Sequence, residues 1–175
     1  MKSIHPTAII ENGAKIGSNV EIGPFCHIGP EVIIGNSCKL KSHVFLDGQT
    51  TIGEENIFFP TSYIGGEPQD LKFNNEKSQV LIGSRNTFRE GVSVHRGTRG
   101  GGGKTVIGND NLLMGYVHIA HDCLIGNNNI FANYTGLSGH VTINNYVTLG
   151  GQNGVAQFLN VGSYVYTGAA SLIDR

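Results

Sequence analysis

An apolar residue recurs at every sixth position through most of this chain. From residue 8 to residue 67 the sequence divides into ten units, AIIENG AKIGSN VEIGPF CHIGPE VIIGNS CKLKSH VFLDGQ TTIGEE NIFFPT SYIGGE, and the third residue of each is Ile, Leu or Phe. The period resumes at Ile82, Phe88 and Val94, and again from Ile107 to Ile173, where only Thr167 is polar. A period of six fits neither a helix nor a simple alternating strand. It fits short strands joined by tight turns, with one strand on each side of a prism.

Composition limits the classes of protein to which the chain can belong. The chain has 175 residues and a net charge of -1, so we expect one domain, and neither a general nucleic-acid binder nor an anionic-membrane binder. No apolar run approaches the roughly 18 residues of a membrane span, and MKSIHPTAII lacks the apolar region of a signal peptide, so we expect no membrane span and a cytoplasmic protein. The three cysteines form no CxxC pair and fall at inward positions of the repeat, where they act as small core residues.

Two segments break the period, Pro68 to Gln79 and Thr98 to Lys104. If both are loops inserted at a corner, counting units across them tests the register. One side then carries the small inward residues Asn56, Asn86, Asn111 and Asn129 in four successive coils, with Phe58, Phe88, Leu113 and Phe131 as their large partners. Buried amides repeated along an axis satisfy one another, so the count predicts an asparagine ladder beside a mostly aromatic stack.

The same count gathers polar residues that are widely separated in the sequence onto one strip. Units centred on Val94, Ile119, Leu137 and Val155 fall on one side, in coils about 4.8 Å apart. They carry His95, His118, His121 with Asp122, His140 and Gln157, and none of these histidines is at an inward position. Both loops leave from the end of this side. We therefore interpret the strip as functional; a solvated surface and a contact between subunits are the alternatives.

The segment VHIAHDC, residues 117–123, favours acid–base chemistry. A neutral imidazole takes a proton near pH 7, and an adjacent carboxylate selects its tautomer and stabilises the cation, so His121 is the candidate base and Asp122 its orienting group. A zinc site needs several ligands converging at about 2.0–2.1 Å, and the sequence has no HxxxH or HExxH spacing. Zinc bound between subunits, as in hexapeptide-fold carbonic anhydrases, is the alternative.

The six-residue repeat resembles that of hexapeptide-repeat proteins, whose all-β fold is a left-handed parallel β-helix with three sides and three repeat units per coil. The usual right-handed preference of crossovers would have predicted the opposite hand. Five further motifs, HIAHDC, VHRGT, PQDLK, DNLLM and LSGHV, together resemble the UDP-N-acetylglucosamine O-acyltransferases, which begin lipid A synthesis with an acyl carrier protein thioester. This resemblance runs through the full length of the chain.

The resemblance implies a role for each matching residue. His121 would deprotonate the glucosamine 3-hydroxyl, Asp122 would orient His121, and the N–H of Gly139 would stabilise the thioester oxyanion. Sugar nucleotide and acyl chain would be bound by Asp70, Lys72, His95, His118, His140 and Gln157. Ala169 matches an acyl-length gate that is often glycine, which favours a shorter chain. The family implies a homotrimer with sites between subunits, no metal and no bound cofactor; phosphopantetheine of acyl carrier protein carries the acyl donor.

Basic residues concentrate around the second interruption. Five of the 12 lysines and arginines lie close together in the sequence, which suits an acidic carrier protein and the phosphate of its phosphopantetheine: Arg85, Arg89, Arg96, Arg99 and Lys104. Charge needed only for solubility is the alternative interpretation.

Two departures from the family keep other functions open. Ala156 stands where the family usually has histidine, and the chain ends at Arg175, whereas the family continues into a helical C-terminal domain. We therefore expect residues 1–175 to form one β-helix domain without that helical domain. The alternatives to a carrier-protein-dependent acyltransferase are an acetyl-CoA-dependent sugar acetyltransferase and an inactive, truncated trimeric paralogue.

Overall fold

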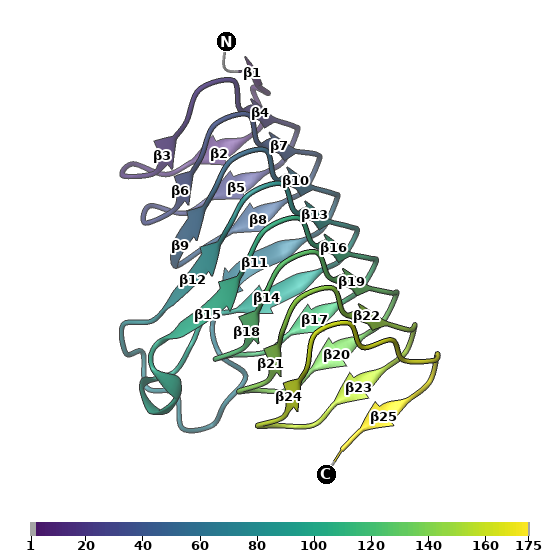
Figure 1. The fold of residues 1–175 in the computed structure, drawn as a ribbon. Helices are drawn as coiled ribbons and strands as arrows, with labels where there is room; N and C mark the ends of the chain where they lie inside the picture. Colours follow the sequence, from purple (N-terminus) through teal and green to yellow (C-terminus); the bar gives the residue numbers. More distant parts are fainter. Residues whose placement is uncertain (1–2, 175) are drawn as a thin grey trace.

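The computed structural model describes residues 3–174 as a prism made of three parallel sheets, which the chain visits in turn (Figure 1). Sheet A contains, in spatial order, β1 (Ser3–Ile4), β4 (Glu21–Ile22), β7 (Lys39–Leu40), β10 (Ile57–Phe58), β13 (Thr87–Phe88), β16 (Leu112–Leu113), β19 (Ile130–Phe131) and β22 (Thr148–Leu149). Sheet B contains β2 (Ile9–Ile10), β5 (His27–Ile28), β8 (Phe45–Leu46), β11 (Tyr63–Gly66), β14 (Ser93–His95), β17 (His118–Ile119), β20 (Gly136–Leu137), β23 (Gly154–Val155) and β25 (Leu172–Ile173). Sheet C contains β3 (Lys15–Ile16), β6 (Ile33–Ile34), β9 (Gln49–Ile52), β12 (Gln79–Ile82), β15 (Lys104–Ile107), β18 (Leu124–Ile125), β21 (Thr142–Ile143) and β24 (Asn160–Val161).

Pairing between strands confirms the period and the position of both loops. Ile10 pairs with Ile28, which lies three repeat units later and one coil further along. Ile64 pairs with Val94 and Val94 with Ile119, and both offsets exceed three units because each interruption lengthens its own coil. The β-helix is left-handed, as the resemblance implied. Most corners turn through one residue with φ between 54° and 64°, including bulky residues such as Tyr116.

The third residues of the repeat units fill the interior. Phe58 and Phe88 stack with ring centroids 4.7 Å apart, and the predicted inward cysteines are all buried. The repeat fails at Thr167, which lies in no strand and is half-buried. Its hydroxyl oxygen instead accepts hydrogen bonds from the N–H of Gly150 and from Asn153, and these contacts hold the last turn in place of an apolar side chain.

The asparagine ladder is present as predicted. Asn86 donates from its backbone N–H (2.9 Å) and its side-chain amide (3.0 Å) to Oδ1 of Asn56, and Asn111 donates in the same way to Asn86. Asn129 continues the ladder through its backbone N–H, 2.9 Å from Oδ1 of Asn111. All four amides are buried. Each side-chain oxygen therefore accepts the buried backbone N–H of the next coil, which water cannot reach. The ladder is thus structural.

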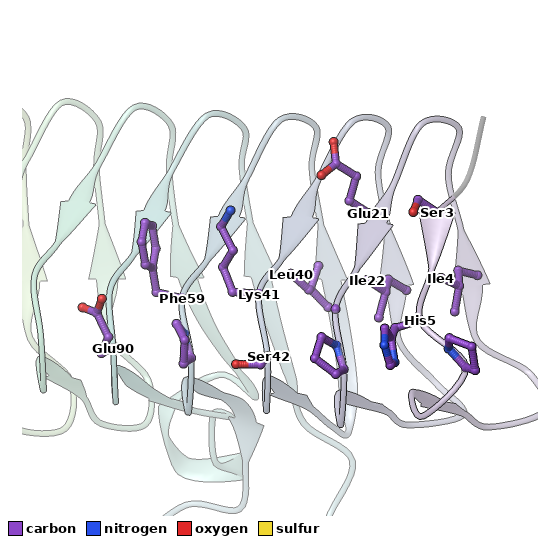
Figure 2. A pocket seen from close by; sticks show the side chains of 14 residues that line it. Ser3, Ile4, His5, Glu21, Ile22, Leu40, Lys41, Ser42, Phe59 and Glu90 are labelled. Carbon is purple, nitrogen blue, oxygen red and sulfur yellow. The ribbon is translucent and has the colours of Figure 1, made fainter.

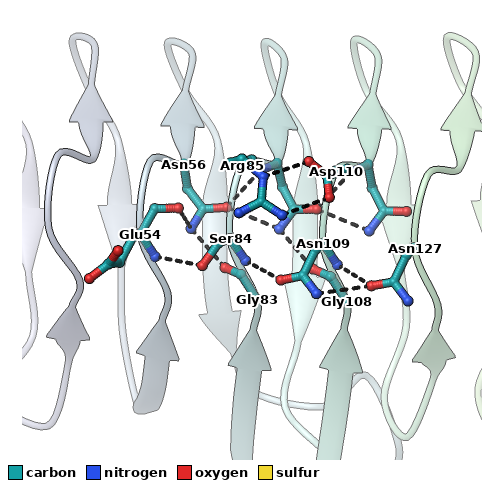
Figure 3. A network of polar contacts seen from close by, with 11 residues as sticks. Glu54, Asn56, Gly83, Ser84, Arg85, Gly108, Asn109, Asp110 and Asn127 are labelled. Carbon is teal, nitrogen blue, oxygen red and sulfur yellow. Dashed lines mark hydrogen bonds and ion pairs between the residues drawn. The ribbon is translucent and has the colours of Figure 1, made fainter.

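A second, outer ladder was not predicted. It follows the corner between sheets C and A (Figure 3), where the N–H of Glu54 donates to Ser84 Oγ (2.9 Å), that of Ser84 to Asn109 Oδ1 (2.7 Å), and that of Asn109 to Asn127 Oδ1 (2.7 Å). Beside it, Arg85 forms a bidentate pair with Asp110. Short polar side chains at this corner thus satisfy the N–H groups that the turns leave unpaired.

Loop 1 (residues 67–78) and loop 2 (residues 96–103) project together from the corner between sheets B and C (Figure 1). Loop 2 contains the short 3-10 helix η1 (Arg99–Gly101). A groove of about 780 Å³ lies elsewhere, along the first coils at the corner between sheets A and B, where Ile4, Leu40 and Phe59 line it (Figure 2). Within residues 3–174 no helix has the length and apolar character of a membrane span.

Candidate active site

The predicted histidines lie at the corner between sheets B and C, under the two loops. His95 ends β14 and His118 begins β17, with ring centroids 5.1 Å apart. His121 follows β17 and His140 follows β20, each in the turn to sheet C, and their centroids are also 5.1 Å apart. The strip therefore begins on the outer face of sheet B, where His118 pairs in register with Ser93, and continues at the edge toward sheet C, where His121 and His140 lie. Gln157 lies in the next turn and is exposed.

Asp122 is the most constrained polar residue at this corner. Its side chain is 0% exposed, and its Oδ2 lies 2.8 Å from Nδ1 of His121. Thr98 of loop 2 donates its backbone N–H to Oδ1 (2.8 Å) and its hydroxyl to Oδ2 (2.7 Å). The backbone N–H of Asp122 donates to Thr105 Oγ1 (2.9 Å). Three donors therefore converge on the two oxygens of one buried carboxylate.

An ionised carboxylate only accepts hydrogen bonds, and this decides the tautomer of His121. The proton of the neutral imidazole must be on Nδ1, which donates to Asp122, so Nε2 carries the free lone pair. The His121 side chain is 14% exposed, so the base is shielded yet reachable. This is the arrangement that general-base catalysis requires.

Gly139 lies against the ring of His121. A methyl group in place of its hydrogen would lie 2.5 Å from Cε1 and 2.8 Å from Nε2 of His121, so a larger residue would displace the imidazole. Gly139 is buried, and among residues 3–174 no acceptor takes its backbone N–H. An unpaired, buried N–H beside a base is suited to bind a developing oxyanion.

His118 and His95 are held differently from His121. Nδ1 of His118 lies 2.8 Å from the Ser93 hydroxyl, and Nδ1 of His95 contacts the backbone carbonyl of Glu67 in loop 1. Burial lowers the pKa of His118, and the neighbouring His95 and His121 lower it further. Among the described residues neither ring contacts a carboxylate, so these two histidines are better suited to hydrogen-bond a ligand than to act as bases.

Asp70 and Lys72 line a cavity that they share with one of the predicted histidines, His140. The cavity has a volume of about 670 Å³ and is bounded by loop 1, loop 2, His140 and Phe158. Oδ1 of Asp70 accepts the backbone N–H of Lys72 at 2.9 Å. Phe158, which the sequence did not single out, stacks on His140 with centroids 4.5 Å apart. The loops thus enclose one side of the candidate site.

The structure does not bring the five predicted carrier-protein residues together. Arg85 lies at the corner between sheets C and A, where it pairs with Asp110, and Arg89 lies at the corner between sheets A and B, paired with Glu90. The other three, Arg96, Arg99 and Lys104, belong to loop 2 or the strand that follows it. Ala169 lies beside Gly150 at the corner between sheets A and B, so within one chain it is not next to the histidines.

His121, Asp122 and His140 could also be considered as metal ligands. Each offers one ligand atom, and these atoms lie within 4.8 Å of one another, with His140 Nε2 3.8 Å from Asp122 Oδ2. Both oxygens of Asp122 already accept hydrogen bonds, so a metal would have to displace them. Cys123 is no nucleophile, because burial raises its pKa to about 12. A site without metal remains our prediction.

Sequence reasoning missed Thr98, although it marked that residue as the start of an interruption. The sequence TRGG (residues 98–101) could have indicated a threonine that caps a tight turn, because two glycines follow Thr98 and Arg99. In the structure Thr98 caps η1, since its Oγ1 accepts the N–H of Gly101 at 3.3 Å. Its second partner, Asp122, is 24 positions away and could be identified only from the folded chain.

Known proteins match this chain along most of its length. The family described as bacterial transferase hexapeptide (six repeats) matches residues 13–48 and 104–139. The acyl-[acyl-carrier-protein]--UDP-N-acetylglucosamine O-acyltransferases of Rickettsia canadensis (strain McKiel) and Rickettsia typhi (strain ATCC VR-144 / Wilmington) are each 54% identical over 121 residues, which cover 69% of this chain. That segment spans 46% of each relative, so the match covers less than half of their length.

Solved structures agree in both sequence and fold. The enzyme LpxA from Acinetobacter baumannii is 49% identical with a TM-score of 0.96, and the match covers 97% of this chain and 66% of that one. LpxA from Bacteroides fragilis 9343, a UDP-N-acetylglucosamine acyltransferase, is 42% identical with a TM-score of 0.95, covering 98% and 67%. The repeat, the histidine corner and these likenesses agree, and the chain belongs to the UDP-N-acetylglucosamine O-acyltransferase family.

Proposed function

We propose that this chain transfers a 3-hydroxyacyl group from acyl carrier protein to the 3-hydroxyl of UDP-N-acetylglucosamine, the first step of lipid A biosynthesis. The names of the Rickettsia relatives support the two substrates. The observation that carries the proposal is the pairing of His121 with Asp122 beside Gly139, whose backbone N–H no acceptor takes within residues 3–174. Base and oxyanion donor are the two groups that acyl transfer to a hydroxyl needs.

The positions of these groups support the following course for the proposed reaction. Nε2 of His121 removes the proton of the sugar hydroxyl as its oxygen attacks the thioester carbonyl. Asp122 stabilises the imidazolium that forms, and the N–H of Gly139 donates to the carbonyl oxygen as it becomes negative, a contribution of about 3–4 kcal/mol. When the C–S bond breaks, the departing sulfur of phosphopantetheine takes the proton from His121. The base is thereby regenerated without metal or bound cofactor.

The residues around the base are the proposed contacts of the two substrates. His95, His118, His140 and Gln157 are the proposed contacts of the sugar nucleotide and acyl chain on the β-helix; Asp70 and Lys72 would close over them from loop 1. Ala169 would limit acyl length only from a neighbouring subunit, which accords with a proposed homotrimer. Of the basic residues, Arg96, Arg99 and Lys104 are nearest to this corner and are the better candidates to meet acyl carrier protein. We place the reaction in the cytoplasm.

The test is a turnover assay with two donors and matched variants. Wild type should transfer from a 3-hydroxyacyl carrier protein and not from acetyl-CoA. His121→Ala should lower kcat by about 10²–10⁴ with little change in KM, because proton transfer is felt mainly in the transition state. His118→Ala should raise KM at least as much as it lowers kcat, and Asp122→Asn should fall between the two in kcat.

Three results of these assays would contradict the proposal. Turnover with acetyl-CoA alone would make the chain a sugar acetyltransferase, and no turnover with either donor would make it an inactive paralogue. Equal losses of kcat in the two alanine variants would place the base elsewhere.

A further inference from the structure

Loop 2 closes over the carboxylate of Asp122 through one residue. Thr98 binds both oxygens at once, with its backbone N–H on Oδ1 (2.8 Å) and its hydroxyl on Oδ2 (2.7 Å). Oδ2 is also the atom that accepts Nδ1 of His121 at 2.8 Å. Two donors from one residue on two oxygens prevent the carboxylate from rotating about its bond to Cβ.

The direction of the Thr98 hydroxyl hydrogen follows from its partners. Oγ1 accepts the backbone N–H of Gly101 at 3.3 Å, and the ionised carboxylate of Asp122 can only accept. The single hydroxyl hydrogen therefore points to Oδ2. Thr98 and Asp122 are both buried, so water does not compete for these bonds.

The rest of the loop keeps Thr98 in place. The backbone of Gly101 passes so close to Asp122 that a methyl group there would lie 2.0 Å from Cγ of the carboxylate. From loop 1, Oε1 of Glu76 accepts the N–H of Arg99 at 3.1 Å, and its Oε2 accepts the N–H of Asn74 at 2.8 Å. Loop 1 thus supports loop 2 at the residue next to Thr98.

We propose that Thr98 is the positioning residue of the base: by holding both oxygens of Asp122 it keeps His121 in its Nδ1–H tautomer, with Nε2 turned toward the substrate. Its effect on rate rests on the proposed function, whereas its effect on the tautomer does not. Without the hydroxyl, Thr98 holds the carboxylate at Oδ1 only, and Oδ2 keeps the Nδ1–H of His121 as its single donor. The carboxylate then rotates, the bond from Oδ2 to Nδ1 weakens, and the competing Nε2–H tautomer becomes populated.

The first test is NMR of the whole chain labelled with ¹⁵N-histidine, which reads the tautomer of each ring. The signal of His121 is assigned from its loss in His121→Gln. Wild type should show Nδ1–H alone; Thr98→Val, which keeps shape and backbone, should show a detectable Nε2–H fraction, and Thr98→Ser should restore the wild-type pattern. Asp122→Asn is the positive control for the wrong tautomer, and Thr142→Val on β21 controls for loss of a threonine hydroxyl elsewhere.

The second test is kinetic. Thr98→Val should lower kcat about tenfold with KM within about twofold, because a displaced base loses alignment in the transition state more than it loses substrate binding. Thr98→Ser should recover most of that loss. A pure Nδ1–H signal in Thr98→Val with an unchanged melting temperature would overturn the proposal, and so would equal losses of kcat in the valine and serine variants. Failure of the proposed function would appear separately, as wild type without turnover and an intact tautomer result.

Discussion

At the scale of single residues, the candidate site depends on close approach as much as on functional groups. Asp122 is buried completely, and His121 has contacts on two sides: the carboxylate at Nδ1 and the backbone of Gly139 against its ring edge. Thr98 holds the carboxylate from above. The orientation of one imidazole is therefore set by three neighbours, of which only Asp122 is adjacent to it in the chain.

Gly139→Ala tests the role of close approach. The new methyl group would lie 2.5 Å from Cε1 of His121, so the ring must move, and we expect kcat to fall by about 10² or more, as for other misplaced catalytic groups. Gly162→Ala is the matched control, because a methyl group there meets no atom within 4 Å. Steady-state kinetics give kcat for both variants. An equal kcat in the two would show that activity does not depend on the close approach of Gly139 to His121.

His118 should make stability depend on pH. Its pKa is lowered in the folded chain, mainly by burial, so the unfolded chain binds its proton more tightly. Stability from this residue is therefore present above its unfolded pKa of about 6.5 and is lost as pH falls below that value. Urea unfolding of wild type and His118→Gln from about pH 7.5 to 5.5 should show a smaller loss of stability on acidification in the variant. A larger loss in the variant would reverse the sign of our argument.

At the scale of elements, two amide ladders run along the prism in different surroundings. The inner ladder is fully buried, whereas the outer ladder, at the corner between sheets C and A, is partly open to water. Both hold successive coils together through backbone N–H groups that no strand partner takes. Loss of one asparagine should lower the free energy of unfolding more in the inner ladder than in the outer one, because water can replace a lost partner only in the outer ladder.

Asn86→Ala and Asn127→Ala compare the two ladders directly. Loss of Asn86 leaves the buried N–H of Asn111 without its acceptor, and we expect the free energy of unfolding to fall by about 2–4 kcal/mol. Loss of Asn127 leaves groups that water can reach, so the expected fall is below about 1 kcal/mol. Urea titrations at equal protein concentration measure both values. A similar cost for the two variants would refute the distinction.

At the scale of the whole molecule, one chain leaves apolar side chains uncovered. On the outer face of sheet B, His27 stacks on Phe45 at 4.4 Å and Phe45 meets Tyr63 edge-on at 5.4 Å; Phe45 is 39% exposed. Pairs of exposed tyrosines also stack at two corners, Tyr116 on Tyr134 and Tyr146 on Tyr164. Aromatic surface of this kind is typical of contacts between subunits.

The protein should therefore sediment as a trimer. We expect a single species at micromolar concentration with about three times the 18.7 kDa mass of one chain. Sedimentation velocity over a dilution series gives the mass, and a structure of the assembly would show whether His121 faces a neighbouring subunit. A monomer at micromolar concentration would remove the basis for a site shared between chains.

The sequence by itself determined the repeat, the inward residues and the asparagine ladder. In a three-sided prism with one six-residue unit per side, the position of a residue in its unit decides whether its side chain points inward or outward. Counting repeat units along the sequence also assigned His95, His118, His121 and His140 to one side of the prism. Only the tertiary structure decided what surrounds them. Loop 2 has no period, so nothing in the order of its residues places Thr98 on Asp122. The structure also showed that the basic residues lie at three different corners. Each repeat unit moves the chain to the next side of the prism, so residues a few positions apart in the sequence can lie on different sides.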